Sequence, residues 1–149
     1  MNPLYLDTSA LAKWYLPEEY ADAFEAFIMA RPGTHISSLA MVEFRCALNR
    51  RRRAGEISEE LVAETYLTFT RQVDAGYLDL LPISDSHFGS ATKLVEFSGV
   101  PLRTLDALHL AVAQNAGCTE FATADRTLAS AAHALGFTVH QFFDPRPSS

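Results

Sequence analysis

A short apolar run followed by three polar residues, Leu4-Tyr5-Leu6-Asp7-Thr8-Ser9, decides how the chain folds. Three large apolar side chains before a turn-forming Asp-Thr-Ser sequence are typical of a buried strand that ends where a helix begins. We expect a strand over residues 4–6 and a helix that Ser9 caps and that continues to Tyr15. Asp7 is therefore expected at the carboxyl end of a strand.

Short strand-like runs alternate with longer helical segments along the rest of the chain. Further strands are expected at residues 35–37, 77–83, 120–123 and 137–141. Further helices are expected from Pro17 to about residue 31, from Leu39 to Ala54, from Ser58 to Gly76, and over residues 85–97, 104–116 and 126–135. Strands separated by helices predict an α/β fold: a three-layer α/β/α sandwich with a central, mainly parallel sheet and helices on both faces.

The composition is that of a globular domain. The 149 residues are 48% hydrophobic and 20% charged, and the mean hydropathy is +0.02, which excludes intrinsic disorder and collagen-like repeats. Residues 1–143 are expected to form one domain, and residues 144–149 a frayed tail.

No apolar run approaches the ~20 residues of a membrane span, and the first residues lack a secretory signal. We therefore expect a cytoplasmic protein without membrane contact. Cys46 and Cys118 lack metal-type or disulfide spacing and are interpreted as small buried hydrophobes.

Four carboxylates stand at positions that call for an explanation. Asp7 and Asp125 follow expected strands, and ligands bind at the carboxyl edge of parallel sheets. Asp106 and Glu43 interrupt helical stretches that are otherwise apolar, where a buried carboxylate is costly unless it is paired, hydrogen-bonded or bound to a metal. Simpler explanations stay open: Asp7 and Asp125 as helix caps, Asp106 as a cap or the partner of a buried Arg, and Glu43 with its head in solvent.

Convergence of these four side chains would demand a cation. Two carboxylates ~4 Å apart repel each other by roughly 4 kcal/mol at an effective dielectric constant of about 20. Ligands that are all oxygen atoms favour Mg²⁺ or Mn²⁺ over Zn²⁺.

Four blocks of the sequence resemble those of PIN-domain ribonucleases, and above all the toxin component of VapBC-type toxin–antitoxin pairs. The blocks are residues 4–11, the helical Glu43, residues 102–111 and residues 123–136. The resemblance extends over residues 4–143 and implies a PIN-like fold. It also implies a Mg²⁺-dependent endoribonuclease, with Mn²⁺ as a substitute, that forms a homodimer and that a cognate antitoxin holds inactive.

The resemblance further implies roles for individual residues. The catalytic acids it implies are Asp7, Glu43, Asp106 and Asp125. Asp7 and Asp106 are expected to bind the metal directly, with Glu43 and Asp125 as further candidate ligands. The hydroxyls expected to orient these carboxylates are those of Thr8, Ser9 and Thr123.

The expected chemistry is hydrolysis of RNA phosphodiester bonds by a metal-activated water. Glu43 or Asp125 would orient or deprotonate that water, and the sequence does not choose between one ion and two. His109 has no required role in the family pattern and is expected to be a core histidine bonded to the backbone.

Five of the twelve basic residues fall within nine positions, namely Arg45, Arg50, Arg51, Arg52 and Arg53. They form either a solvated helix end, where cations stabilise the negative C-terminus, or an RNA-contacting rim beside the acids. The net charge of −6 argues against electrostatic coating of nucleic acid but not against a metal-dependent nuclease.

A cluster of large apolar side chains recurs at helical spacing and is interpreted as part of the core, in preference to a groove for an antitoxin helix or a homodimer face. Its residues are Tyr20, Phe24, Phe27 and Ile28.

Other classes of function remain as alternatives. A catalytically inactive RNA-binding or scaffold version of the same fold would differ from the nuclease in its response to titration with Mn²⁺. A phosphoacceptor receiver-type domain needs paired acids near the first strand and a Lys after a late strand, but Asp7 has no acidic neighbour and the lysines are Lys13 and Lys93. A phosphatase with a nucleophilic Asp needs a second Asp two positions later, where this chain has Ser9.

Overall fold

The structure is a computed structural model that describes residues 3–17, 19–31 and 33–142. Its elements, in chain order, are β1 (Leu4–Leu6), α1 (Thr8–Tyr15), α2 (Ala21–Met29), β2 (Thr34–Ser37), α3 (Ser38–Arg53), α4 (Glu59–Asp74), β3 (Asp79–Leu81), α5 (Asp85–Phe97), α6 (Thr104–Asn115), β4 (Glu120–Thr123), α7 (Arg126–Ala134) and β5 (Thr138–Gln141). The expected frayed tail, residues 144–149, lies outside the described residues. Within the described ranges, no helix combines the length and apolar character needed to span a membrane.

The five strands form one sheet in the order β3-β2-β1-β4-β5, and every neighbouring pair is parallel. From the central strand β1 the chain adds β2 and β3 on one side, then returns to place β4 and β5 on the other. The direction of winding therefore reverses between β1 and β4. Ligands of open α/β sheets bind beyond the carboxyl ends of the strands at such a switch point.

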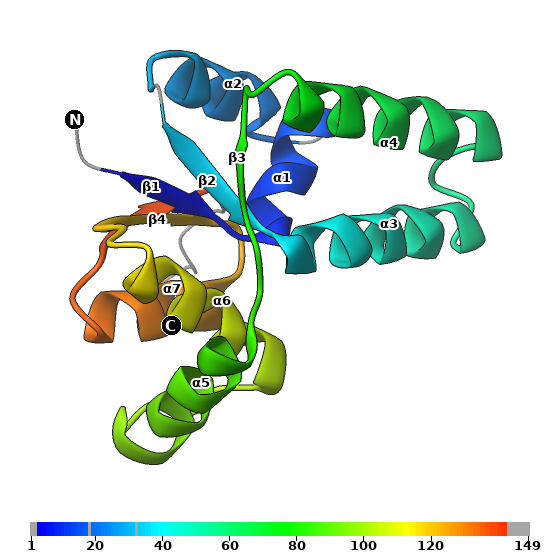
Figure 1. Cartoon of the computed structure of the whole chain (residues 1–149). Coiled ribbons are helices and arrows are strands. Elements are labelled where there is room, and N and C mark those ends of the chain that lie inside the picture. The colour runs from blue at the N-terminus through cyan, green and yellow to red at the C-terminus, as the bar shows by residue number, and fades with distance from the viewer. Residues whose placement is uncertain (1–2, 18, 32, 143–149) are drawn as a thin grey trace, which may run out of the picture.

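Helices cover both faces of this sheet, which confirms the three-layer fold (Figure 1). Leu4 and Leu6 of β1 belong to the core beneath α1 to α4, whereas Tyr5 between them belongs to the core beneath α6 and α7. This division follows from the alternation of side chains along a strand. Burying a single large apolar side chain stabilises the fold by roughly 1.5–3 kcal/mol, so both layers hold the sheet in place.

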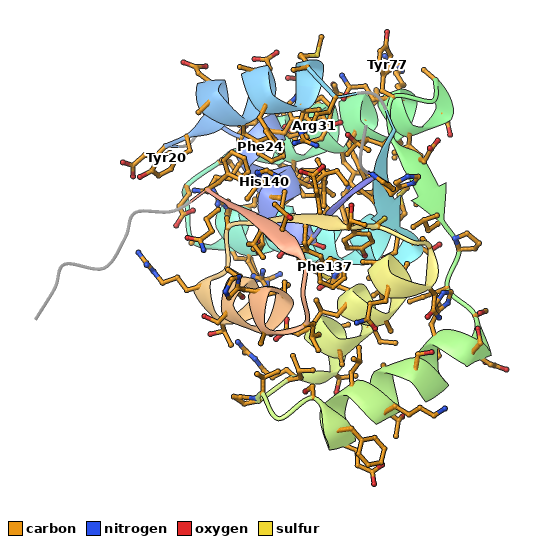
Figure 2. All side chains as sticks on the ribbon, turned by 90° about the vertical axis from the view of Figure 1, so that its left-hand side faces the viewer. Tyr20, Phe24, Arg31, Tyr77, Phe137 and His140 are labelled. Atoms are coloured by element: carbon orange, nitrogen blue, oxygen red, sulfur yellow. The ribbon has the colours of Figure 1, made fainter. Side chains whose placement is uncertain are left out.

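Several element boundaries differ from the sequence-based expectation. Helix α1 begins at Thr8 and is capped by Asp7, not by Ser9, and β3 ends at Leu81, not at residue 83. Two further differences have clear local reasons. Helix α2 begins at Ala21 and not at Pro17, because Tyr20 has a left-handed backbone with φ 71°. Strand β3 begins at Asp79 and not at Tyr77, because residues 76 and 77 form the cap that follows the C-terminus of α4. Gly76, at φ 85°, donates to Val73 and Tyr77 donates to Gln72, a Schellman motif. The Tyr77 side chain is 68% exposed (Figure 2).

The expected core cluster and the two cysteines have different outcomes. Phe24 and Ile28 are buried, and Tyr20 and Phe27 pack against the same core while remaining partly buried, so the core interpretation is confirmed. Cys118 is buried as expected, but Cys46 is exposed. The expectation for Cys46 was wrong because its position on α3 faces the pocket described below.

Candidate active site

Asp7 lies at the switch point and is held there by hydrogen bonds with one neighbouring strand, β4, and with the first turn of α1. It is only 3% exposed, and its backbone N–H donates to Ala122 of β4. Oδ1 accepts from the Ala10 backbone N–H at 2.9 Å and thereby caps α1. The Ser9 hydroxyl lies 2.8 Å from Oδ1, and the Thr123 hydroxyl donates to Oδ2 at 2.6 Å.

Burial makes the ionised form of the Asp7 carboxyl group costly. Burial raises its pKa above the ordinary value, while the hydrogen bond from Thr123, the charge of His109 and the bonds from Ala10 and Ser9 act in the opposite direction. Burial disfavours the charged form because the protein interior solvates it poorly. A cation in the neighbouring pocket would offset that cost.

Asp125 follows β4 and reaches the same edge of the sheet. Its Oδ1 accepts from the Leu128 backbone N–H at 3.0 Å, which caps α7. Its own N–H donates to the Thr123 hydroxyl at 3.0 Å, so Thr123 connects Asp125 to Asp7. The capping roles that the sequence allowed for Asp7 and Asp125 are both present, and both residues nevertheless line one pocket.

Asp106 stands in the first turn of α6, and its side chain is 17% exposed. Burial raises its pKa, and the nearby charge of Asp125 raises it further, whereas Arg103 and His109 lower it. The contact with Arg103 is loose, with 3.9 Å between Nε and Oδ2, and the Arg103 side chain is largely exposed. Asp106 is therefore not the partner of a buried arginine, and its repulsion by Asp125 shows that the two acids share one region.

Glu43 enters from α3 and is fixed by two donors. The Thr8 hydroxyl donates to Oε1 at 3.0 Å, and Nε2 of His109 lies 2.5 Å from the same oxygen. His109 is buried as expected, but the expected bond to the backbone was wrong: its other ring nitrogen, Nδ1, lies 2.5 Å from the Tyr5 hydroxyl. The spacing of three residues from Asp106 was the available sequence signal for His109, since it places both side chains on one helix face.

A single open pocket brings the four acids together. They come from the end of β1, from α3, from α6 and from the β4–α7 junction, and are Asp7, Glu43, Asp106 and Asp125. Thr8 and Ser9 also line the pocket, whereas Thr123 is fully buried beneath Asp7. The walls include apolar residues (Leu39, Val42 and Leu105) and basic residues (Lys13, Arg50 and Arg51).

The arginine cluster is divided by the helix that carries it. Arg50 and Arg51 line the pocket, whereas the Arg45 guanidinium lies over the Tyr66 ring, 5.2 Å from its centroid. Arg52 and Arg53 stand with Arg50 and Arg51 in the last turn of α3, where positive charge interacts favourably with the helix dipole. Two of the five candidate RNA contacts are thus placed beside the acids.

The residues of this pocket fit a hard divalent cation. The carboxylate and hydroxyl groups that line the pocket offer oxygen ligands of the kind that a hard cation prefers. The buried carboxyl of Asp7 is held in place by hydrogen bonds from Ser9, Ala10 and Thr123. Within the described part of the chain, no three His, Cys, Asp or Glu side chains are arranged closely enough to enclose an ion by themselves.

Comparison with known proteins assigns the chain to a family. The PIN domain family model matches residues 4–134. Ribonuclease VapC46 of Mycobacterium tuberculosis is 32% identical over 142 residues, which cover 93% of this chain and 97% of that relative.

Solved structures show the same fold at low sequence identity. The crystal structure of VapC20 from Mycobacterium tuberculosis, described as a sarcin–ricin loop cleaving toxin, matches with a TM-score of 0.67 and 16% identity over 86% of this chain and 94% of that one. VapBC2 from Rickettsia felis, bound to a DNA fragment from its promoter, matches with a TM-score of 0.63 and 13% identity over 93% of this chain and 98% of that one. The chain therefore belongs to the PIN-domain family, among its VapC-type ribonucleases.

Proposed function

We propose that this ribonuclease is a Mg²⁺-dependent endoribonuclease toxin, inhibited by a cognate antitoxin, that hydrolyses RNA at the pocket between β1 and β4. The observation that carries the proposal is the presence of four carboxylates, from four separate segments, in one pocket at the switch point of the sheet. The similarity to VapC46 and to VapC20, a toxin described as cleaving the sarcin–ricin loop, supports RNA as the substrate class. The similarity to VapBC2 supports an antitoxin partner. We further propose a homodimer, as the family resemblance implies.

In this proposal the protein holds the ion and positions the reacting water. Asp7 and Asp106 would hold the ion, and Ser9 and Thr123 keep the Asp7 carboxylate in place through the hydrogen bonds described above. A bound divalent ion supplies Lewis acidity toward the scissile phosphate and lowers the pKa of bound water. Glu43 or Asp125 would orient the attacking water and accept its proton. Hydrolysis leaves a 5′-phosphate and a 3′-hydroxyl.

Titration with Mn²⁺ distinguishes the nuclease from an inactive scaffold. An ion that binds only the folded state at about 100 times its Kd stabilises that state by about 2.7 kcal/mol, which corresponds to a rise in Tm of roughly 5–10 °C for a domain of this size. We expect this shift in the wild type and its loss in Asp106→Asn. The control is Asp74→Asn, at an exposed position near the end of α4, which should keep the full shift.

The same samples are then assayed for cleavage of a structured RNA. We expect cleavage with Mg²⁺, none after chelation, and recovery when excess Mg²⁺ is added. A wild-type protein that shows neither a Tm shift with Mn²⁺ nor RNA cleavage would support the inactive scaffold instead.

The arginines that line the pocket are expected to contact RNA phosphates. Replacing both Arg50 and Arg51 by Ala should raise KM for RNA and reduce the slope of log K against log[salt] by about 1.4, since each phosphate contact to a single strand contributes about 0.7. The matched control is the double replacement of Arg52 and Arg53, which carries the same change of charge but lies outside the pocket lining. Equal salt slopes in the two double variants would return all four arginines to the role of a solvated helix end.

A further inference from the structure

We propose that His109 is a positioning residue that holds Glu43 in its place at the pocket, an inference that rests on the proposed ribonuclease function. His109 is 2% exposed and lies in the most buried helix of the structure, where six of its neighbours between Ala107 and Ala113 are also buried. Its Nε2 is 2.5 Å from Oε1 of Glu43. Because that partner is a carboxylate, Nε2 carries the hydrogen of this contact.

The other side of the imidazole ring is held just as firmly. Nδ1 lies 2.5 Å from the Tyr5 hydroxyl, and the same hydroxyl lies 3.0 Å from the Ser37 hydroxyl. The rings of Tyr5 and His109 are also in edge contact, with 5.7 Å between their centroids. Tyr5 is fully buried on the central strand, so the ring of His109 is anchored to the middle of the sheet.

This set of contacts connects the two helical layers across the carboxyl edge of the sheet. Glu43 belongs to α3, on the face covered by α1 to α4, and His109 belongs to α6, on the opposite face (Figure 1). Helix α6 also carries Asp106, one turn before His109. The contact between His109 and Glu43 therefore sets where the α3 carboxylate stands relative to the α6 carboxylate.

The geometry also determines which oxygen of Glu43 is left for the reaction. Both Thr8 and His109 contact Oε1, so neither of these two contacts uses Oε2. Glu43 lines the pocket, and with Oε1 fixed by two donors its carboxylate cannot rotate without breaking both contacts. Removing an outer hydrogen-bond partner that holds a reactive or metal-binding side chain commonly lowers activity or metal affinity by about 10–100-fold.

Two substitutions of similar size separate positioning from mere filling of the core. The amide nitrogen of Gln can replace Nε2, whereas that of Asn reaches only the position of Nδ1. We expect His109→Gln to keep kcat within about threefold, and His109→Asn to lower kcat by about 10–100-fold with KM changed less than twofold. His133→Gln, on the exposed side of α7, is the control and should match the wild type.

A double-mutant cycle with Glu43→Gln tests whether His109 acts through Glu43. All rates are normalised to the folded fraction measured by urea unfolding. If His109 positions Glu43, His109→Asn costs no further activity once Glu43 is Gln, because coupled residues are not additive. Fully additive losses would mean that His109 only stabilises the core, and would overturn the inference.

A spectroscopic measurement on the metal-free protein makes the result independent of activity. The Nε2 proton in a short bond to a carboxylate should give a downfield imidazole resonance in the proton NMR spectrum, retained in His133→Gln and lost in both Glu43→Gln and His109→Asn. Absence of that resonance in the wild type would contradict the His109–Glu43 contact. A wild type that shows the resonance but cleaves no RNA would overturn the proposed function and leave the contact established.

Discussion

Replacing Asp7 by Asn, or Asp106 by Asn, is expected to lower the rate of RNA cleavage by about 10³-fold. Both carboxylates are proposed to bind the catalytic ion, and the charge that such an ion stabilises in the transition state is worth several kcal/mol. At about 1.4 kcal/mol per tenfold change in rate, a loss of this size corresponds to roughly 10²–10⁴-fold. Asn keeps the shape and one acceptor oxygen but not the negative charge. Single-turnover cleavage of RNA at saturating Mg²⁺ measures the effect.

The same change at Asp106 is expected to make the metal-free protein more stable at neutral pH. Burial, followed by the charge of Asp125, raises the pKa of Asp106 in the folded state. A raised pKa means that ionisation destabilises the folded protein: the penalty is absent below the unfolded value of about 3.9 and complete above the folded pKa. Asp106→Asn removes the penalty, so its advantage over the wild type should grow as the pH rises from about 4 toward neutral.

Urea unfolding from pH 4 to pH 8 without divalent ions measures this advantage. Asp74→Asn, at an exposed position, should follow the wild type at every pH. Saturating Mg²⁺ should narrow the difference between Asp106→Asn and the wild type, because the ion stabilises the folded state that binds it. If Asp106→Asn keeps the wild-type rate of RNA cleavage, Asp106 is excluded as a metal ligand. If Asp106→Asn is less stable than the wild type at pH 7, the charge of Asp106 is compensated within the folded protein.

The fold and the placement of the acids could be predicted because both depend on local pattern. The apolar run before Asp7 has the length of a strand, and Gly-terminated helical segments separate the strands, which favours a parallel sheet. Once the sheet is parallel, residues that follow its strands, such as Asp7 and Asp125, must lie at one edge. The helical acids Glu43 and Asp106 stood out because their neighbours are apolar.

The details that the sequence did not predict depend on how one element sits against another. The partners of His109 are Tyr5 and Glu43, from a strand and from a helix of the opposite layer, and no periodicity within α6 specifies them. The division of the arginines has a similar cause, since Arg45 points toward Tyr66 of α4 while Arg50 and Arg51 lie on the pocket side of α3.

Replacing Glu120 by Ala is expected to destabilise the protein by about 3 kcal/mol, the lower end of the cost of breaking a buried ion pair. Glu120 begins β4, and its side chain is 8% exposed. Arg31 donates to both of its carboxylate oxygens, at 2.9 Å for the Nη2–Oε1 contact, and Nε2 of His140 lies 2.9 Å from Oε1. Figure 2 shows Arg31 and His140 close together near α2 and β5. The lower end applies because the Arg31 side chain, at 20% exposed, keeps some contact with water.

The ionised pair should also make stability depend on pH in the direction opposite to that of Asp106. Hydrogen bonding to Arg31 is the main cause of the lowered pKa of Glu120, so the stabilisation is present above the unfolded value of about 4.3 and is lost as the pH falls through the folded pKa. Glu120→Gln keeps the shape of the side chain without its charge, so its deficit relative to the wild type should be large at pH 7 and should shrink below about pH 4. Glu96→Gln, on an exposed turn of α5, supplies the control. A Glu120→Gln deficit that stays constant from pH 7 to pH 3 would mean that shape and hydrogen bonding, and not the charge, hold Glu120 of β4 to Arg31.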